Sequence, residues 1–481
     1  MIPMTLSSSF PWRHRILAVA AAAALAACAT PIATTRPDLA LPATWAEASF
    51  ANAADRAVER DWWRGFGSGE LAQLIDEAQA GSPDLRIAAE RVTQAELSAR
   101  LAGSSLYPQL SVGADMGSQY SRTRGEAGVT RDATSASIGI NYEIDLWGRV
   151  AAVNESARAS LRGSQYDLET ARLSLTTGVA NAYFQVVAAR IQLDVTRRNL
   201  AIAEKLFSIV EARYQNGVAS ALDVSQQRTQ VLSQRAAILP LEVAERQSLS
   251  ALAILLGRPP QGMTVAATNF SAVTVPEPAA GMPSTLLVRR PDIASAEASL
   301  AAADANVAAA RAALLPTISL SGAAGLASDS LLTLSNPAFS VGITASVLRS
   351  LFDADSKRTQ IEVNESSRRQ LVEAYRRDVY AALKEVDDAL ANVGRYREQQ
   401  TTREVIRDEA ARSLRLSEVQ LREGTATLST LLDAQRALFT AENELALVVQ
   451  ARLGASVDLF KALGGGWEMP AGDPSAARAT R

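Results

Sequence analysis

The sequence predicts an α+β protein built from two tandem copies of one large unit. Two landmarks reveal the repeat: "SPDL" at 82–85 recurs as "RPDI" at 290–293, and a turn that opens on Gly217 recurs at Gly424. In each copy, two segments alternate apolar and polar residues, and a very long segment without proline follows them. Alternation predicts strands, and a long proline-free run of helix formers predicts a helix. A repeat of this length is too long for a solenoid.

The chain opens with the layout of a secretory signal. Arg13 and Arg15 precede an apolar run from Ile16 to Leu25, which is too short to span a bilayer as a permanent helix. The run ends in "LAAC", which resembles a bacterial lipobox, a sequence that is cleaved before its Cys and lipidated on the thiol. The alternative is an ordinary signal with a chance Cys, but Cys28 is the one Cys of the chain. We therefore expect residues 1–27 to be removed and Cys28 to carry lipid. By the same resemblance, Ala29 favours the outer membrane.

Composition limits the possible functions. Hydrophobic residues make up 48% and charged residues 21% of the chain, so it is neither disordered nor a polytopic helical membrane protein. A net charge of −3 gives no reason to expect a nucleic-acid partner. The one His, His14, would leave with the signal. The lack of His and free Cys excludes a His/Cys metal site and a Ser–His or Cys–His nucleophilic site. The chain also has no phosphate-binding glycine loop of the P-loop form. We therefore expect no metal, no catalytic residues, no enzymatic activity and no cofactor except the covalent lipid on Cys28.

The repeat divides the rest of the chain into four parts. We expect a lipid-anchored N-terminal segment over 28–80, a first repeat over 81–288, a second repeat over 289–458 and a C-terminal segment over 459–481. Each repeat should contain a helix, two strands, a very long helix, a turn and a return helix. The long helices are expected over 149–215 and 355–422, each roughly 100 Å long, which suggests coiled-coil packing. Pro240 should kink or break the first return helix, which Gly257 ends.

The predicted strands have one apolar face and one face of small or polar residues. The apolar positions are Leu110, Val112, Ala114, Met116 and Tyr120, then Ala136, Ile138, Ile140, Tyr142, Ile144 and Leu146, then Ile318 and Leu320, then Phe339, Val341, Ile343 and Val347. Strands that face lipid on one side and a lumen on the other have this pattern. A soluble antiparallel sheet with one wet face has it equally.

If these strands span a membrane, the protein must oligomerise. Four strands cannot close a barrel, and an open sheet edge cannot lie in lipid. A dimer would give eight strands, whose interior is filled by side chains, whereas a trimer would give twelve and leave a lumen. The acidic residues Asp115, Glu143 and Asp145 lie on the face opposite the apolar one, which favours a water-filled lumen.

The mature chain also resembles the outer-membrane efflux protein family of the TolC/OprM type, in particular its lipoprotein branch. The similar motifs are "DWWRGFG" at 61–67, "YEIDLWGR" at 142–149, "LGRPP" at 256–260, "LLDAQRALF" at 431–439 and "LFKALGGGW" at 459–467. The resemblance implies a homotrimer in which each chain gives four strands to a 12-stranded transmembrane β-barrel and long helices to a periplasmic α-barrel. It also implies the exit duct of a tripartite efflux pump, with a periplasmic adaptor and an inner-membrane transporter as partners.

The resemblance assigns roles to the two glycine turns. They become the periplasmic tips that dock the adaptor, made of Gly217, Val218 and Ser220 and of Gly424, Thr425 and Thr427. Ser220, three residues before Asp223, also has the form of a capping box that restarts the helix.

A periplasmic gate is expected beyond the second tip. In the family, the Asp of "LLDAQR" points into the closing pore and a nearby Arg pairs with it, which matches Asp433 and Arg436. The alternative is that Asp433 caps a helix that starts after Thr430 and pairs only locally with Arg436. Lipoprotein members often have Leu where this chain has Ser429. Leu428 or Leu432 would then have to form the apolar ring, or the gate lacks one.

Two other functions remain open at this level. The same architecture could conduct secreted proteins, although the lipobox and the "LFKALGGGW" ending favour small-molecule efflux. A structural lipoprotein with long coiled coils would reach across the periplasm without a pore. Trp62, Trp63 and Trp467 are best explained as packing of the terminal segments rather than as a ligand site.

Overall fold

The computed structural model describes residues 39–47, 58–276, 282–334 and 336–470. The predicted signal, Cys28 and the end of the C-terminal segment lie outside the described residues. The chain forms two compact units. A strand-containing unit comprises Arg91–Ser164 and Ala296–Tyr375, and a helical unit comprises the described parts of 39–90, 165–295 and 376–470. Each unit therefore contains segments of both repeats.

The order of elements is the same in both repeats. The first repeat contains α3 (Pro83–Ser104), β1 (Gln109–Ser121), β2 (Val129–Ile144), α4 (Arg149–Gln215) and α5 (Ala221–Leu255). The second contains α7 (Pro291–Ala312), β3 (Thr317–Ser328), β4 (Ala338–Leu348), α8 (Ser356–Arg422) and α9 (Leu428–Ala462). A short helix η1 (Trp62–Phe66) and α2 (Gly69–Gly81) precede the first repeat, and η2 (Pro283–Thr285) and α6 (Leu286–Arg289) precede the second.

The long helices have the predicted bounds almost to the residue, and two details differ from the prediction. β2 begins at Val129, six residues before the expected start, because these residues continue the antiparallel pairing with β1. Of the kink or break expected at Pro240, the break is absent, because α5 is helical throughout. Pro240 and Ala236, whose carbonyl loses its partner, are both exposed, so water can satisfy this carbonyl.

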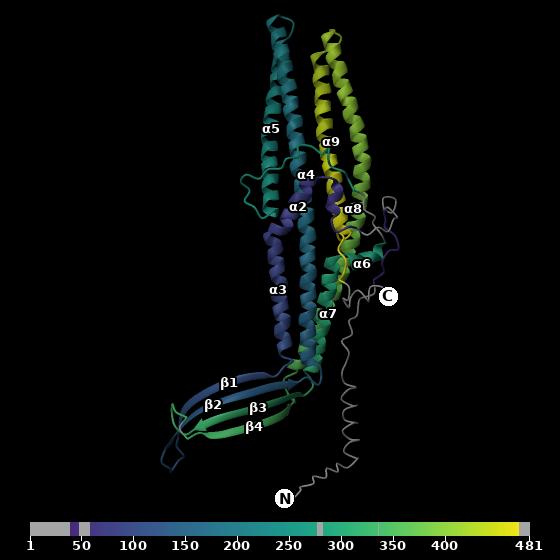
Figure 1. Cartoon of the computed structure of the whole chain (residues 1–481). Helices are drawn as coiled ribbons and strands as arrows, with labels where there is room; N and C mark the ends of the chain where they lie inside the picture. The colour runs from purple at the N-terminus through teal and green to yellow at the C-terminus, as the bar shows by residue number, and fades with distance from the viewer. Residues whose placement is uncertain (1–38, 48–57, 277–281, 335, 471–481) are drawn as a thin grey trace. The chain divides into compact units, whose positions relative to one another are not determined.

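The four strands form one antiparallel sheet in the order β1-β2-β3-β4 (Figure 1). The β1–β2 and β3–β4 pairs are the hairpins of the two repeats, and β2 pairs with β3 from Ile144↔Ile318 to Thr134↔Ser328. β1 and β4 are the edge strands. The sheet is therefore open along both edges.

In the helical unit, α4 and α5 form an antiparallel hairpin, and so do α8 and α9 (Figure 1). Arginine–glutamate pairs join α4 to α5 at positions of α4 that lie seven residues apart. The pairs are Arg190–Glu245 at 2.7 Å, Arg197–Glu242 at 2.9 Å and Glu204–Arg235 at 2.6 Å. Seven-residue spacing is the periodicity of coiled-coil packing, as the length of the helices predicts.

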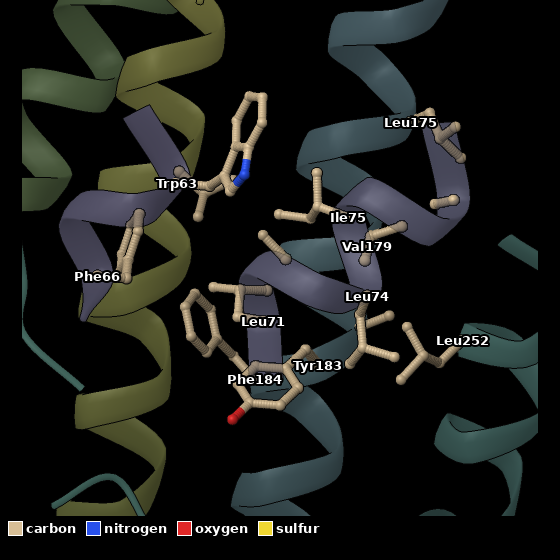
Figure 2. Close-up of a cluster of buried hydrophobic side chains, with 14 of the residues drawn as sticks. Trp63, Phe66, Leu71, Leu74, Ile75, Leu175, Val179, Tyr183, Phe184 and Leu252 are labelled. Carbon is tan, nitrogen blue, oxygen red and sulfur yellow. The ribbon is translucent and has the colours of Figure 1, made fainter. Parts of the chain in front are cut away.

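The largest core of the helical unit fixes the N-terminal segment against the hairpins. Figure 2 shows Leu71, Leu74 and Ile75 of α2 gathered with side chains of α4. Trp62 stacks on Phe460 of α9 at 4.9 Å between ring centroids, and Trp467 meets Tyr166 edge-on at 5.6 Å. The tryptophans therefore pack the terminal segments, as predicted.

Candidate functional site

The register of the sheet gives it two chemically different faces. Directly paired residues of neighbouring strands lie on the same face, so the pairing defines rows across all four strands. The apolar rows are Leu110–Ile140–Gly322–Ile343, Val112–Ile138–Ala324–Val341 and Ala114–Ala136–Leu326–Phe339. The rows between them are Ser111–Gly139–Ala323–Gly342, Gly113–Ser137–Gly325–Ser340 and Asp115–Ser135–Ala327–Ala338. The alternation seen in the sequence is thus in phase on all four strands.

The apolar face is exposed. Val112 and Ile343 are each 78% exposed, and Phe339 is 71% exposed. A soluble antiparallel sheet buries such a face against its core, because each exposed apolar side chain forgoes the hydrophobic free energy of burial. A continuous apolar face of this kind marks an interaction surface, and its alternation with small polar residues fits lipid on one side and water on the other.

The three acidic residues predicted for the lumen have different surroundings. Asp115 is exposed on the polar face of β1. Glu143 accepts two hydrogen bonds from Arg149, at 2.9 and 2.7 Å, and Asp145 accepts one from the Ala151 N–H at 2.7 Å. Glu143 and Asp145 therefore fix the passage from β2 into α4, a contribution that the alternation pattern does not reveal.

The first helical turn reverses the chain between α4 and α5. Gly217 has φ +74°, its N–H donates to the Tyr214 carbonyl at 2.9 Å, and the Val218 N–H donates to the Arg213 carbonyl at 2.8 Å. This is the Schellman pattern, in which a residue in the left-handed conformation ends a helix. Glycine is favoured at such a φ because it has no Cβ.

The predicted capping box at Ser220 is confirmed. The Asp223 N–H donates to the Ser220 hydroxyl oxygen at 3.1 Å, and the Ser220 N–H donates to the Asp223 carboxylate at 2.8 Å. Hydrogen bonds from the Ser220 N–H and hydroxyl lower the pKa of Asp223. Because the carboxylate is the form that accepts these bonds, the box is complete at neutral pH.

Replacement of Ser220 by Ala should destabilise the first turn of α5 by about 1 kcal/mol, because the Asp223 N–H loses its partner. Hydrogen exchange of the amides at the start of α5 should become faster. The depressed pKa of Asp223 means that this stabilisation is present above its unfolded pKa and is lost as the pH falls through the folded one. Ser225→Ala, one turn further along the exposed side of α5, is the control. Equal exchange rates in both variants would contradict the prediction.

The second turn repeats the first with different side chains. Gly424 has φ +71°, its N–H donates to the Leu421 carbonyl, and the Thr425 N–H donates to the Gln420 carbonyl at 2.9 Å. Thr427 caps α9 by accepting a hydrogen bond from the Thr430 N–H at 3.3 Å. The two turns therefore share one backbone hydrogen-bond pattern, and they lie at the same end of the helical unit in Figure 1.

The side chains give the two turns different surfaces, which the sequence analysis missed. Tyr214, Val218 and Leu222 of the first turn are 48%, 70% and 65% exposed. The corresponding residues of the second turn, Leu421, Thr425 and Ser429, are one partly buried leucine and two exposed hydroxyl residues. Comparison of the two repeats position by position would have revealed this difference.

Asp433 and Arg436 lie on an exposed side of α9. Their carboxylate and guanidinium are 3.3 Å apart, and the two side chains are 70% and 59% exposed. Asp433 does not cap the helix: the cap is Thr427, and α9 starts before Thr430. The local ion pair between Asp433 and Arg436 is therefore present as the alternative predicted, but the capping role that it gave Asp433 is wrong.

Leu428 and Leu432, the two alternatives for an apolar ring, both take part in packing within the chain. Leu432 is 5% exposed, and Leu428 packs against the cluster of Leu414, Leu431 and Ala434. Leu206 of α4 joins the same cluster, so it links the two hairpins near their turns. Ser429 is exposed and places a hydroxyl group one helical turn before Asp433.

Among the described residues, no group of three or more His, Cys, Asp and Glu side chains is arranged to hold a metal ion. No helix in the described part of the chain is long and apolar enough to cross a membrane.

The chain is similar to known proteins in both sequence and structure. The model of the family described as outer membrane efflux protein matches residues 74–258 and 282–465. The pyoverdine export outer membrane protein OpmQ of Pseudomonas aeruginosa is 38% identical over 464 residues, 94% of this chain and 96% of that protein. The cation efflux system protein CusC of Escherichia coli O6:H1 is 30% identical over 460 residues, 94% of this chain and 99% of that protein. The solved structure of the outer-membrane channel OprN superposes with a TM-score of 0.81 at 26% identity, covering 90% of this chain and all of that one.

Proposed function

Because this chain belongs to the outer membrane efflux protein family, we propose that it is the exit duct of a tripartite pump that expels small molecules. The family consists of outer-membrane efflux channels, so the chain is a transport protein and not an enzyme. The names of the two relatives refer to pyoverdine and to cations, which favours small solutes over secreted proteins as the cargo class.

The single observation that carries the proposal is the open sheet with one exposed apolar face. Its apolar side chains suit lipid, and its opposite face of Ser, Gly, Thr and Asp115 suits water. Both sheet edges are free, and unpaired backbone groups cannot remain in lipid. Three copies that pair edge to edge would close a barrel of twelve strands with a water-filled lumen. We therefore take the working form to be a homotrimer.

The turns at Gly217 and Gly424 are the proposed docking tips for a periplasmic adaptor, which connects the duct to an inner-membrane transporter. Their backbone groups are satisfied locally, so the tips need no partner to hold their shape. Val218 with Ser220 and Thr425 with Thr427 form the exposed surface that such a partner would contact. A lipid on Cys28 would tether the N-terminal segment to the outer membrane, with most of the chain in the periplasm.

Asp433, Arg436 and Ser429 are the proposed periplasmic gate. They lie on one exposed side of α9, close to the second tip. In a trimer, three carboxylates around one axis repel each other unless a cation, a proton or Arg436 neutralises them. The closing constriction would then be polar, since Leu428 and Leu432 are occupied in packing.

One experiment tests assembly, anchoring and conduction together. The protein is extracted gently from outer membranes, analysed by native mass spectrometry and inserted into planar bilayers. The expected result is a trimer with three acylated N-termini that conducts ions, and Cys28→Ser should lose the acyl mass but keep the trimer. Asp433→Ala should raise the conductance, whereas Thr440→Ala, two turns further along α9, should leave it unchanged. A monomer without conductance would overturn the duct, and a trimer of Cys28-bearing chains without lipid would overturn only the anchor.

A further inference from the structure

The turn between β4 and α8 presents an unpartnered apolar pair. Leu351 is 95% and Phe352 is 89% exposed, and no other large apolar side chain of the described residues is as exposed as these two. Ala354 and Asp355, which follow the pair, have φ +52° and +60°. Consecutive non-glycine residues in the left-handed region are uncommon, so local preference alone does not explain this turn.

In the first repeat, an apolar pair also follows the second strand, and there the adjacent strand is present. Leu146 and Trp147 are the second and third residues after β2, whereas Leu351 and Phe352 are the third and fourth after β4. Gly148, with φ +74°, leads into the helix of the first repeat. The Trp147 indole Nε1 donates to the Pro316 carbonyl at 2.7 Å, and Pro316 lies just before β3, the strand that pairs with β2. The Trp147 side chain therefore contacts the start of the adjacent strand.

Among the described residues, the second repeat has no such adjacent strand beyond β4. β4 is an edge strand of the sheet that the described residues form. The repeat counterpart of Leu315–Pro316 is Tyr107–Pro108, which lies just before β1 at the other edge. Tyr107 is 70% exposed and Pro108 is also exposed, whereas Leu315 and Pro316 are partly buried. The exposed pair Leu351–Phe352 therefore lies at one edge of the sheet, after β4. The exposed residues Tyr107 and Pro108 lie at the other edge, before β1.

We propose that Leu351 and Phe352 of one protomer pack on Tyr107 and Pro108 of the next copy, where β4 meets the β1 of that copy. This inference rests on the proposed assembly of copies and adds a defined contact to it. The contact repeats between chains what Trp147 and Pro316 do within one chain. The Phe352 side chain has no N–H, unlike the Trp147 indole, so the intermolecular contact is apolar and aromatic rather than hydrogen-bonded.

Site-directed cross-linking tests the contact in the full-length protein in its membrane. A chain with Phe352→Cys and Tyr107→Cys should give covalent dimers and trimers with a short bis-maleimide. Each single variant reports any linkage through Cys28. Phe352→Cys with Tyr120→Cys, at the far end of β1, is the matched negative control. Trp147→Cys with Leu315→Cys should link within one chain and leave the protomer mass unchanged except for the linker.

A second measurement tests whether residue 352 contacts lipid instead of the next protomer. The thiol of the single variant Phe352→Cys is labelled with bimane, and a brominated phospholipid is added as quencher. We expect weak quenching, because the partner's Tyr107 covers the site. A trimer in native mass spectrometry with strong quenching and no 352–107 linkage would overturn the contact and leave the duct intact. Absence of any trimer would overturn the contact together with the proposed function.

Discussion

Replacement of Ile343 by Arg is expected to abolish insertion of the assembled channel. Ile343 lies in the middle of β4, is 78% exposed and belongs to the apolar row with Leu110 and Ile140. An arginine on the lipid face near the midplane of a barrel costs about 2–4 kcal/mol, and a homotrimer bears this cost three times. The measurement is the amount of trimer recovered from outer membranes.

The neighbouring residue provides a matched control. Thr344 is exposed too, but it pairs with Ser321 on the polar face. Thr344→Arg should therefore assemble, because its charge points toward water in the proposed barrel. If both variants assembled equally well, the apolar face would not contact lipid, and the orientation proposed for the sheet would be wrong.

The second large effect is expected in the helical unit, where Arg290→Met should destabilise the fold by about 3 kcal/mol. The Arg290 guanidinium is 9% exposed and donates to Asp292 at 2.6 Å, to Glu385 at 2.7 Å and to the Ala462 carbonyl at 3.2 Å. It thus joins the start of α7 to α8 and to the end of α9. This loss is at the low end of the range for a broken buried pair, because both carboxylates are partly exposed and water can reach them.

The loss of stability expected for Arg290→Met should depend on pH, because it involves the ionised carboxylate of Asp292. Burial alone would raise the pKa of Asp292, but the hydrogen bonds and charge of Arg290 outweigh burial and hold the pKa below its usual value. A carboxyl group with a lowered pKa stabilises the folded state at any pH above its pKa in the unfolded chain, about 3.9. This stabilisation is lost as the pH falls through its pKa in the folded protein. In denaturant unfolding, the variant should therefore have a clearly lower free energy of unfolding than the parent at pH 7. This difference should become smaller below about pH 4.

Arg311→Met is the control for a paired arginine at the surface. Arg311 is 58% exposed and pairs with Glu365 at 2.7 Å. An exposed pair contributes about 0–1 kcal/mol, so this variant should unfold close to the parent. Equal losses in the two variants would mean that burial of Arg290 does not determine its contribution.

Most of the fold was accessible from the sequence because its signals are local. Period-two alternation fixed which strand residues share a face, and the absence of proline fixed the long helices. The glycine turns and the Ser220 capping box follow from chemistry within a few residues. The unbroken helix at Pro240 was not predictable in this way, because it depends on whether the freed carbonyl faces water.

The candidate site was predicted less completely because it depends on tertiary contacts. The sequence placed Glu143 and Asp145 on the polar face, but only the fold shows that they hold Arg149 and the Ala151 amide. It allowed Leu432 to face a pore, whereas packing buries this side chain. The unequal surfaces of the two tips follow from Tyr214, Val218 and Leu222, which become meaningful once the chain reversal is seen in three dimensions.

The closed hydrogen bonding of the two glycine turns has a consequence for evolution. Each reversal satisfies its backbone groups within about a dozen residues, through Gly217 with Ser220 or Gly424 with Thr427. The outward side chains between these fixed points are free to change without a cost to the helices that they join. If the tips dock the adaptor as proposed, exchange of a few tip residues would be enough to match the chain to a new partner, while the sheet and the long helices are inherited unchanged.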